Sequence, residues 1–139
     1  MVRVDDTGAS NISTPLADVV TGSTASDILT GLAGNDLITG AAGNDNITGG
    51  TGIDTSIYSG LAADYTITQN LVYQYYPGMT LKSRMLAFLG NLHLVSSAVV
   101  ATGSFVVHDN NPADGKDGTD TVTDIEKLKF SDQIIDLVT

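Results

Sequence analysis

The sequence predicts a mainly β fold: a parallel β-roll of nine-residue repeats, capped by C-terminal strands and carrying one inserted amphipathic helix. Aspartate recurs every nine residues in the first part of the chain, an aliphatic residue follows it by two positions in most copies, and glycines crowd the residues before it. A strict period is typical of architectures in which each unit buries its apolar residue only by stacking on neighbours. With 139 residues the chain is expected to form one domain, with a lead-in over 1–12, the roll over 13–57 and a capping region over 58–139.

The repeat unit combines a glycine turn with a very short strand. The best-preserved copies read GLAGNDLIT over 31–39, GAAGNDNIT over 40–48 and GGTGIDTSI over 49–57, after weaker copies over 13–21 and 22–30. Glycine at positions one, two and four permits a tight turn and leaves backbone carbonyls uncovered. The three residues after the turn, with one aliphatic side chain among them, suit a strand rather than a helix. Each unit is therefore predicted to form half a coil of a parallel roll.

The aspartate at position six places a carboxylate beside the carbonyl oxygens of its own turn. Hard, anionic oxygen ligands suit calcium at six- to eight-fold coordination. Aspartates in glycine-rich segments can also serve only to cap turns, but capping does not explain a fixed period. The spacing therefore favours a row of calcium sites along the turns.

These units resemble the hemolysin-type, or RTX (repeats-in-toxin), calcium-binding nonapeptide G-G-x-G-x-D-x-U-x. The resemblance is tight over 31–57 and looser over 13–30, and it departs where Leu32 and Ala41 replace the second glycine. Further departures are Ser23, Ala25 and Ser56. The resemblance implies a parallel β-roll in which two repeats make one coil, so that stacked partners lie eighteen residues apart and Ca2+ ions bind between stacked turns.

The stacking implied by the resemblance pairs Asp27 with Asp45 and Asp36 with Asp54, with a weaker third pair of Asp18 and Asp36. The implied ligands are these aspartates together with turn positions one, three and four of the best-preserved units. The full set is Asp18, Asp27, Asp36, Asp45, Asp54, Gly31, Ala33, Gly34, Gly40, Ala42, Gly43, Gly49, Thr51 and Gly52.

The segments after the repeats carry a second resemblance. IYSGLAADYTIT over 57–68 and DGTDTVTDIEKLKFSD over 117–132 resemble the segments that close many RTX β-rolls, with a short hairpin between them. We expect a strand over 58–69 and a returning strand over 105–109. The final IIDLVT resembles the uncleaved C-terminal signal of type I secretion, and it fits an ordinary last strand equally well.

Two features near the C-terminus leave alternatives open. Asp109, Asp114, Asp117 and Asp120 surround glycines and suggest one more calcium loop, although their spacing does not match an EF-hand. Residues 70–104 exceed the few turn residues that a closing hairpin needs. Within them one apolar helical face is predicted, made of Leu81, Met85, Phe88, Leu89, Leu92 and Val95.

Three roles are open for the helix predicted within residues 70–104. It could pack on the roll or its cap, dock a protein or glycan partner, or insert into a membrane. A homodimer contact would also cover its apolar face. Membrane insertion is the least favoured of these, because the stretch is interrupted by glycine and polar residues.

The composition of the chain argues against several classes of function. The formal net charge is −10, and every acidic residue except Glu126 is an aspartate. Such a chain is a poor partner for nucleic acids and anionic membranes, and without cysteine it has neither disulfides nor thiolate metal sites. His93 and His108 are isolated and no catalytic motif is present, so we expect no enzymatic activity.

The sequence as a whole predicts a calcium-binding module that folds on calcium binding outside the cell. It is expected to be the C-terminal part of a type I-exported RTX-like protein, secreted or held at the bacterial cell surface. The N-terminus lacks an apolar segment, so no cleaved secretory peptide is expected. Two alternatives remain: an adhesion or ligand-binding module that uses 70–104, and an accessory domain of an exported enzyme.

Overall fold

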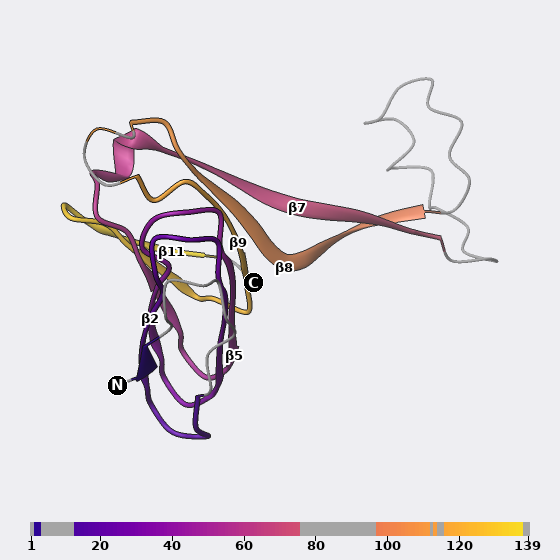
Figure 1. Ribbon diagram of the computed structural model, residues 1–139. Coiled ribbons are helices and arrows are strands. Elements are labelled where there is room, and N and C mark those ends of the chain that lie inside the picture. The colour runs from indigo at the N-terminus through magenta and orange to yellow at the C-terminus, as the bar shows by residue number, and fades with distance from the viewer. Residues whose placement is uncertain (1, 4–12, 76–96, 112, 114–115, 138–139) are drawn as a thin grey trace.

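The computed structural model describes residues 2–3, 13–75, 97–111, 113 and 116–137 (Figure 1). The mainly β class is confirmed, since these residues form strands and a single short 3-10 turn, η1 (Ala62–Asp64). The predicted helix over residues 81–95 lies outside the described ranges. The strands are β1 (Val2–Arg3), β2 (Val19–Thr21), β3 (Ile28–Ala33), β4 (Leu37–Thr39), β5 (Asn46–Thr51), β6 (Thr55–Ile57), β7 (Tyr65–Tyr75), β8 (Ser97–Asp109), β9 (Thr119–Thr123), β10 (Lys127–Lys129) and β11 (Ile134–Asp136).

The strands of successive repeats alternate between two sheets. One sheet has the order β1-β2-β4-β6-β10-β11 and the other has the order β3-β5-β9-β8-β7. The chain therefore winds from one sheet to the other and back, as the stacked coils of Figure 1 show. Within each sheet a repeat strand pairs in parallel with the strand two repeats later, so that Ile38 lies beside Val20, and Ile47 beside Leu29. This is the eighteen-residue stacking that the sequence predicted.

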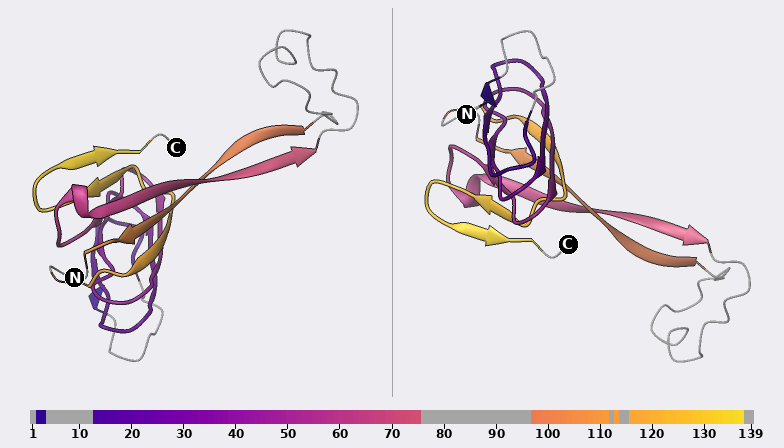
Figure 2. Two further views of the ribbon diagram at one scale, coloured as in Figure 1. Left: turned by 90° about the horizontal axis from the view of Figure 1, so that it is seen from above. Right: turned by 90° about the horizontal axis from the view of Figure 1, so that it is seen from below.

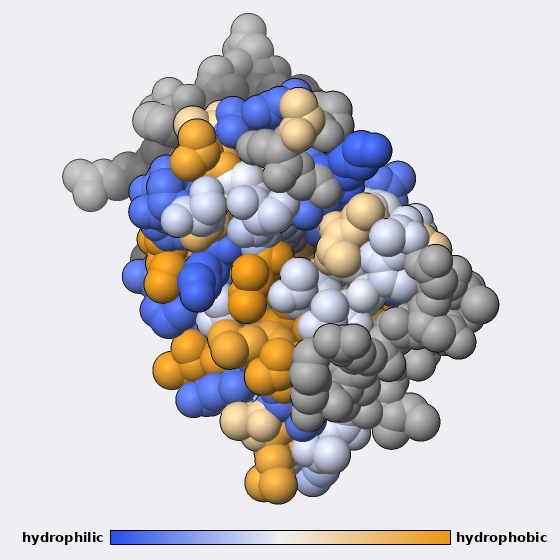
Figure 3. Space-filling model, turned by 60° about the vertical axis from the view of Figure 1, so that its left-hand side comes forward, coloured by the Kyte–Doolittle hydropathy of each residue, from blue (hydrophilic) through white to orange (hydrophobic). Residues whose placement is uncertain are grey.

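The core is a row of position-eight side chains between the two sheets. Val20, Leu29, Ile38 and Ile47 are completely buried, whereas the position-seven residues before them, such as Leu37, point outward and are partly exposed. Successive side chains of a strand face opposite sides of a sheet, so a three-residue strand can bury only its middle one. Apolar side chains accordingly remain on the surface in Figure 3.

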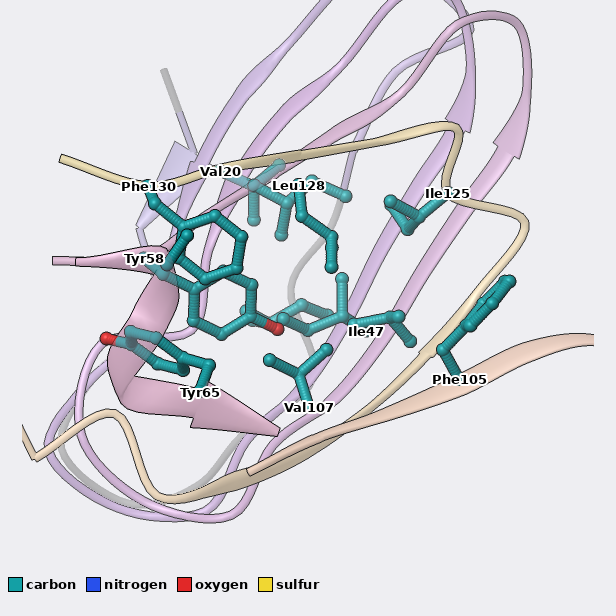
Figure 4. Close-up of a cluster of buried hydrophobic side chains, with 13 residues drawn as sticks. Val20, Ile47, Tyr58, Tyr65, Phe105, Val107, Ile125, Leu128 and Phe130 are labelled. Atoms are coloured by element: carbon teal, nitrogen blue, oxygen red, sulfur yellow. The ribbon is translucent and has the colours of Figure 1, made fainter. Parts of the chain in front are cut away.

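The C-terminal segment completes both sheets. β9 adds to β5 and β10 adds to β6, both in parallel and in the register of the repeats. Val122 and Leu128 thereby extend the two rows of buried position-eight side chains. Figure 4 shows Leu128, Ile125 and Val107 pointing into the same interior as Val20 and Ile47.

An aromatic cluster lies next to these closing strands. The rings of Tyr58 and Phe130 stack with centroids 5.4 Å apart, and Tyr65 packs against both. All three rings are buried. Large rings bury much apolar area each, so the cluster covers the end of the stack where no further repeat follows.

The hairpin after the repeats is longer than the sequence predicted, and it begins later. The expected strand over 58–69 begins only at Tyr65, because the chain first turns through η1, where the Ala62 amide donates to Asp132. β7 then continues to Tyr75, and β8 begins at Ser97 rather than near 105.

Residues 70–75 and 97–104, assigned from the sequence to an insertion, are therefore strand. They form a twisted two-stranded ribbon, the outer part of β7 and β8, that extends beyond the other strands of their sheet (Figure 2). Alternating apolar and polar residues in this part of the chain suit paired strands as well as they suit a helix. The remainder of the predicted insertion, 76–96, lies outside the described residues. Within the described part of the chain, no helix has the length and apolar character needed to cross a membrane.

Candidate calcium sites

The turns of the repeats stack backbone against backbone. Gly34, Gly43 and Gly52 occupy position four, each with positive φ. A Cβ on Gly52 would lie 1.7 Å from the carbonyl oxygen of Gly34, which belongs to the turn stacked against it on the same edge. Leu32 and Ala41, which stand where the nonapeptide has its second glycine, also adopt positive φ, at 84° and 71°. The left-handed backbone is therefore kept at these two positions, at a cost of roughly 1–2 kcal/mol each.

The position-six carboxylates form two ladders, one along each edge of the stack. On one edge the amide of Asp36 donates to Asp54 Oδ1 at 2.8 Å, and the amide of Asp18 donates to Asp36 Oδ1 at 2.7 Å. On the other edge the amide of Asp27 donates to Asp45 Oδ1 at 2.8 Å. The pairs expected from eighteen-residue stacking are thus in contact, including the pair of Asp18 and Asp36 that the sequence favoured least.

Four of the ladder carboxylates have an oxygen without a hydrogen-bond partner. This holds for Asp36 Oδ2, Asp45 Oδ2, Asp54 Oδ2 and Asp27 Oδ1, although all four residues are at most 3% exposed. A buried carboxylate oxygen without a partner costs several kcal/mol of folding free energy. Each edge therefore carries a regular series of buried negative oxygens that need a positive charge.

These oxygens face hollows that only glycine leaves open. A Cβ on Gly31 would lie 2.3 Å from Asp36 Oδ2 and 2.6 Å from the carbonyl oxygen of Gly49 in the next turn of that edge. On the other edge, a Cβ on Gly40 would lie 2.2 Å from the unpartnered Asp45 Oδ2. A Cβ on Gly22 would lie 2.3 Å from the carbonyl oxygen of Gly40 and 2.8 Å from Asp27 Oδ2, which accepts hydrogen bonds from Ser23. The hollows at Gly31 and Gly22 therefore each bring a carboxylate and a carbonyl oxygen from successive turns together.

The donor set fits calcium rather than a transition metal. Among the described residues, no three His, Cys, Asp or Glu side chains converge on one point, so an ion must also take backbone carbonyls and water. Calcium accepts such a mixture of oxygen ligands in flexible geometry. The predicted ligands at positions three and four lie in the same turns. The carbonyl oxygen of Thr51 accepts the amide of Gly34, and the carbonyl oxygen of Gly43 lies close to the Cα of Gly118. Their role as ligands stays a prediction.

The sequence missed two members of the ladders. The amide of Asp45 donates to Asp120 Oδ1 at 2.8 Å, and that of Asp54 donates to Glu126 Oε2 at 2.7 Å. A signal for Asp120 was present, since GKDGTDTVT over 115–123 has the glycine, aspartate and aliphatic positions of the nonapeptide. Glu126 had no such signal, because no glycine precedes it in its unit.

Asp114 of the predicted extra loop lies outside the described residues, and the other aspartates of that loop have separate partners. Asp117 accepts hydrogen bonds from the amide of Ser59 and the hydroxyl of Tyr65. Asp109 accepts the amide of Asn111 and donates its own amide to the carbonyl of Gly118. These two residues hold the closing segments together, and among the described aspartates of the loop only Asp120 joins a ladder.

Burial and like charge raise the pKa values of three ladder carboxyls, those of Asp45, Asp54 and Asp120. Burial, reinforced by the charges of Asp27 and Asp117, raises the pKa of Asp45 to about 6. Burial and the charge of Asp45 raise the pKa of Asp120 to about 8. The surroundings of the metal-free stack therefore disfavour the ionised form of these carboxyls.

This predicts an unusual pH dependence for the metal-free chain. Since the folded pKa values of Asp45 and Asp120 exceed the ordinary value of 3.8, the folded state binds more protons than the unfolded state between about pH 4 and 8. Its stability should fall as the pH rises through that window. In chelator, far-UV circular dichroism should show a larger folded fraction at pH 5 than at pH 8, and Asp120→Asn should weaken this dependence above pH 6. A folded fraction that rises with pH would contradict the account.

Stacked glycine turns with buried, unpartnered carboxylates define a repeat protein whose two edges carry rows of oxygen atoms. Residues 21–55 match the family model of the RTX calcium-binding nonapeptide repeat in four copies, and the chain therefore carries an array of these calcium-binding repeats. Comparison with curated proteins gave no match. The match confirms the repeats that the sequence identified from residue 22 onward, and it leaves out the weaker copy over 13–21 except for its last residue.

The two-edge arrangement predicts which substitutions act on the same ion. Asp27 and Asp45 are stacked neighbours on one edge and are expected to hold the same ion, so Asp27→Asn added to Asp45→Asn should remove no further calcium. Asp36 belongs to the other edge, so Asp36→Asn added to Asp45→Asn should remove more. Asparagine keeps an oxygen that accepts the stacking amide while it removes the charge. Calcium stoichiometry by isothermal titration distinguishes the two double variants, and equal losses would refute the edge assignment.

Proposed function

We propose that the chain is a calcium-binding module with a parallel β-roll fold, in which ions bind between turns stacked along both edges. The observation that carries the proposal is the repeated pairing of a buried, unpartnered carboxylate oxygen with a glycine hollow, as at Asp36 with Gly31 and Asp45 with Gly40. The alternation of repeat strands between two parallel sheets supports the roll. Aspartate carboxylates and turn carbonyls would hold each ion, and calcium would supply the charge that the buried oxygens need.

The module is further proposed to fold outside the cell on calcium binding, as the C-terminal part of a type I-exported protein, and to act without catalysis. Support comes from the formal net charge of −10, which opposes compaction until cations neutralise it. Extracellular calcium modules work at dissociation constants of about 0.1–1 mM, so the same chain would stay unfolded where calcium is scarce. The closing strands share one core with the repeats, which supports a single domain.

Calcium binding is tested by isothermal titration of the whole chain. Calcium should bind to several sites per chain, whereas magnesium should compete poorly, because it dehydrates reluctantly and demands octahedral geometry. As a matched control, Asp136→Asn removes an exposed charge that pairs with Lys127 and contacts no ladder carboxylate among the described hydrogen bonds, and it should leave the titration unchanged. Absence of calcium binding at millimolar concentrations would reject the proposed function.

A second candidate function is adhesion or ligand binding through 70–104. The observation that favours it is the outer part of β7 and β8, which extends beyond the other strands of their sheet as a two-stranded ribbon (Figure 2). Replacing 76–96 by a short Asn-Gly turn should keep calcium binding, because β7 and β8 pair directly. Loss of cell-surface or glycan binding in that variant would support the second candidate, and an unchanged profile would count against it. The role of an accessory domain in an exported enzyme depends on the parent gene.

A further inference from the structure

We propose that the closing segment builds an additional calcium site with the last repeat, formed by Asp54, the carbonyl of Asp124 and the carboxylate of Glu126. The proposal rests on the proposed function, and it extends calcium binding to a segment outside the nonapeptide repeats at 21–55. It follows from a comparison of two consecutive positions along one edge of the stack. Each position is called a rung, and it consists of one ladder aspartate, the glycine hollow beside it and the residues stacked on it.

The upstream rung lies wholly within the repeats. The hollow at Gly31 is bounded by Asp36 Oδ2 and by the carbonyl oxygen of Gly49. The amide of Asp36 donates to Asp54 Oδ1 at 2.8 Å, and the amide of Thr55 donates to Asp36 O at 2.9 Å. The rung therefore has four oxygen functions: an unpartnered carboxylate oxygen, a carbonyl from the next turn, a carboxylate of the next turn and the carbonyl that fixes the register.

The downstream rung repeats these functions with atoms of the closing segment. A Cβ on Gly49 would lie 2.6 Å from Asp54 Oδ2 and 2.1 Å from the carbonyl oxygen of Asp124. The amide of Asp54 donates to Glu126 Oε2 at 2.7 Å, and the amide of Lys127 donates to Asp54 O at 3.1 Å. Asp124 thus stands in for Gly49, and Glu126 for Asp54, one step further along the edge.

The registers of β9 and β10 explain how an unrelated sequence reaches this geometry. Thr123 pairs with Thr48, which places Asp124 beside Gly49, and Lys127 pairs with Thr55, which places Glu126 beside Asp54. Asp124 adopts φ of 50°, in the left-handed region, where the chain turns from β9 to β10. Aspartate is among the few residues other than glycine that enter this region readily. The buried side chains of Ile125 and Leu128 point into the core on either side of Glu126 and fix its strand (Figure 4).

The chemistry of the junction demands a cation as strongly as that of the repeats. Asp54 is completely buried and its Oδ2 has no hydrogen-bond partner, while Glu126 brings a second carboxylate to the same rung. Two carboxylates and a carbonyl are ligands that calcium accepts. An ion there would join residues about seventy positions apart in the chain, so calcium would fasten the closing strands onto the repeats.

The test compares Glu126→Gln with Asp136→Asn by isothermal titration of the whole chain. Glutamine keeps an oxygen that can accept the Asp54 amide but removes the charge. We expect one calcium fewer per chain, or one site weakened by at least about tenfold. Asp136→Asn removes an equal charge from the same segment, where the side chain is 77% exposed, and should match the wild type. Wild-type stoichiometry and affinity in Glu126→Gln would overturn the proposal.

A measurement on the unmodified chain tests the proposal even if Glu126→Gln fails to fold. In crystals grown with calcium, anomalous scattering should place an ion between Asp54 Oδ2 and the carbonyl of Asp124. Ions in the repeat hollows, such as that at Gly31, but none at this junction would overturn the proposal while leaving the proposed function intact. No ion at any hollow would reject the proposed function as well.

Discussion

Raising calcium from chelated to millimolar concentrations should increase the stability of the folded chain by several kcal/mol. A ligand that binds only the folded state stabilises it by about 2.7 kcal/mol per site when its concentration is one hundred times the dissociation constant. Two sites would add about 5 kcal/mol, which is comparable with the whole stability of a small domain. The effect is large because each ion neutralises oxygens that are otherwise buried without partners, such as Asp36 Oδ2.

Thermal melts across a calcium series measure this effect. The melting temperature should rise steadily with the logarithm of the calcium concentration, while magnesium at equal ionic strength should have little effect. Sodium chloride at matched ionic strength controls for general screening of the acidic chain. A melting temperature that responds equally to all three salts would show that the chain needs only charge screening, not bound calcium.

Ile38→Ala should destabilise the calcium-saturated protein by about 2–5 kcal/mol. Ile38 is the middle residue of β4, and its side chain is fully buried between the two sheets. Truncation removes apolar contacts and leaves a cavity that stacked coils, fixed by backbone pairing on both sides, can collapse only partly. Denaturant unfolding in saturating calcium gives the free energy of unfolding directly.

The neighbouring residue supplies a matched control. Leu37→Ala removes a side chain of the same size from the same strand, but Leu37 points outward and is 41% exposed. Its cost should stay below about 1 kcal/mol. Similar costs for the two variants would mean that the strand does not bury its middle residue as described.

The period of the repeats made the first half of the fold predictable. Each unit contains its own turn and its own buried residue, so Asp36 and Ile38 could be assigned from local sequence alone. The stacking of Asp27 on Asp45 then followed from the length of one coil, and the structure has that pair in contact. Local rules suffice where a structure is built from identical neighbours.

The closing region was less predictable, because its contacts join distant parts of the chain. Glu126 contacts Asp54 across 72 positions, and only the pairing of β10 with β6 brings them together. The ribbon of β7 and β8 was underestimated for a related reason. Cross-strand pairing decides its length, and short alternating segments such as 70–75 carry no clear signal of strand or helix by themselves.

The most direct test of the account is far-UV circular dichroism of the whole chain at neutral pH, first in chelator and then after calcium is restored. The account predicts a largely unfolded spectrum in chelator, because the stacked carboxylates of both edges lie buried without counter-charge. The β-sheet spectrum should return when calcium is added, and magnesium should not restore it. An unchanged β-sheet spectrum in chelator would contradict the claim that calcium holds the stacked turns together.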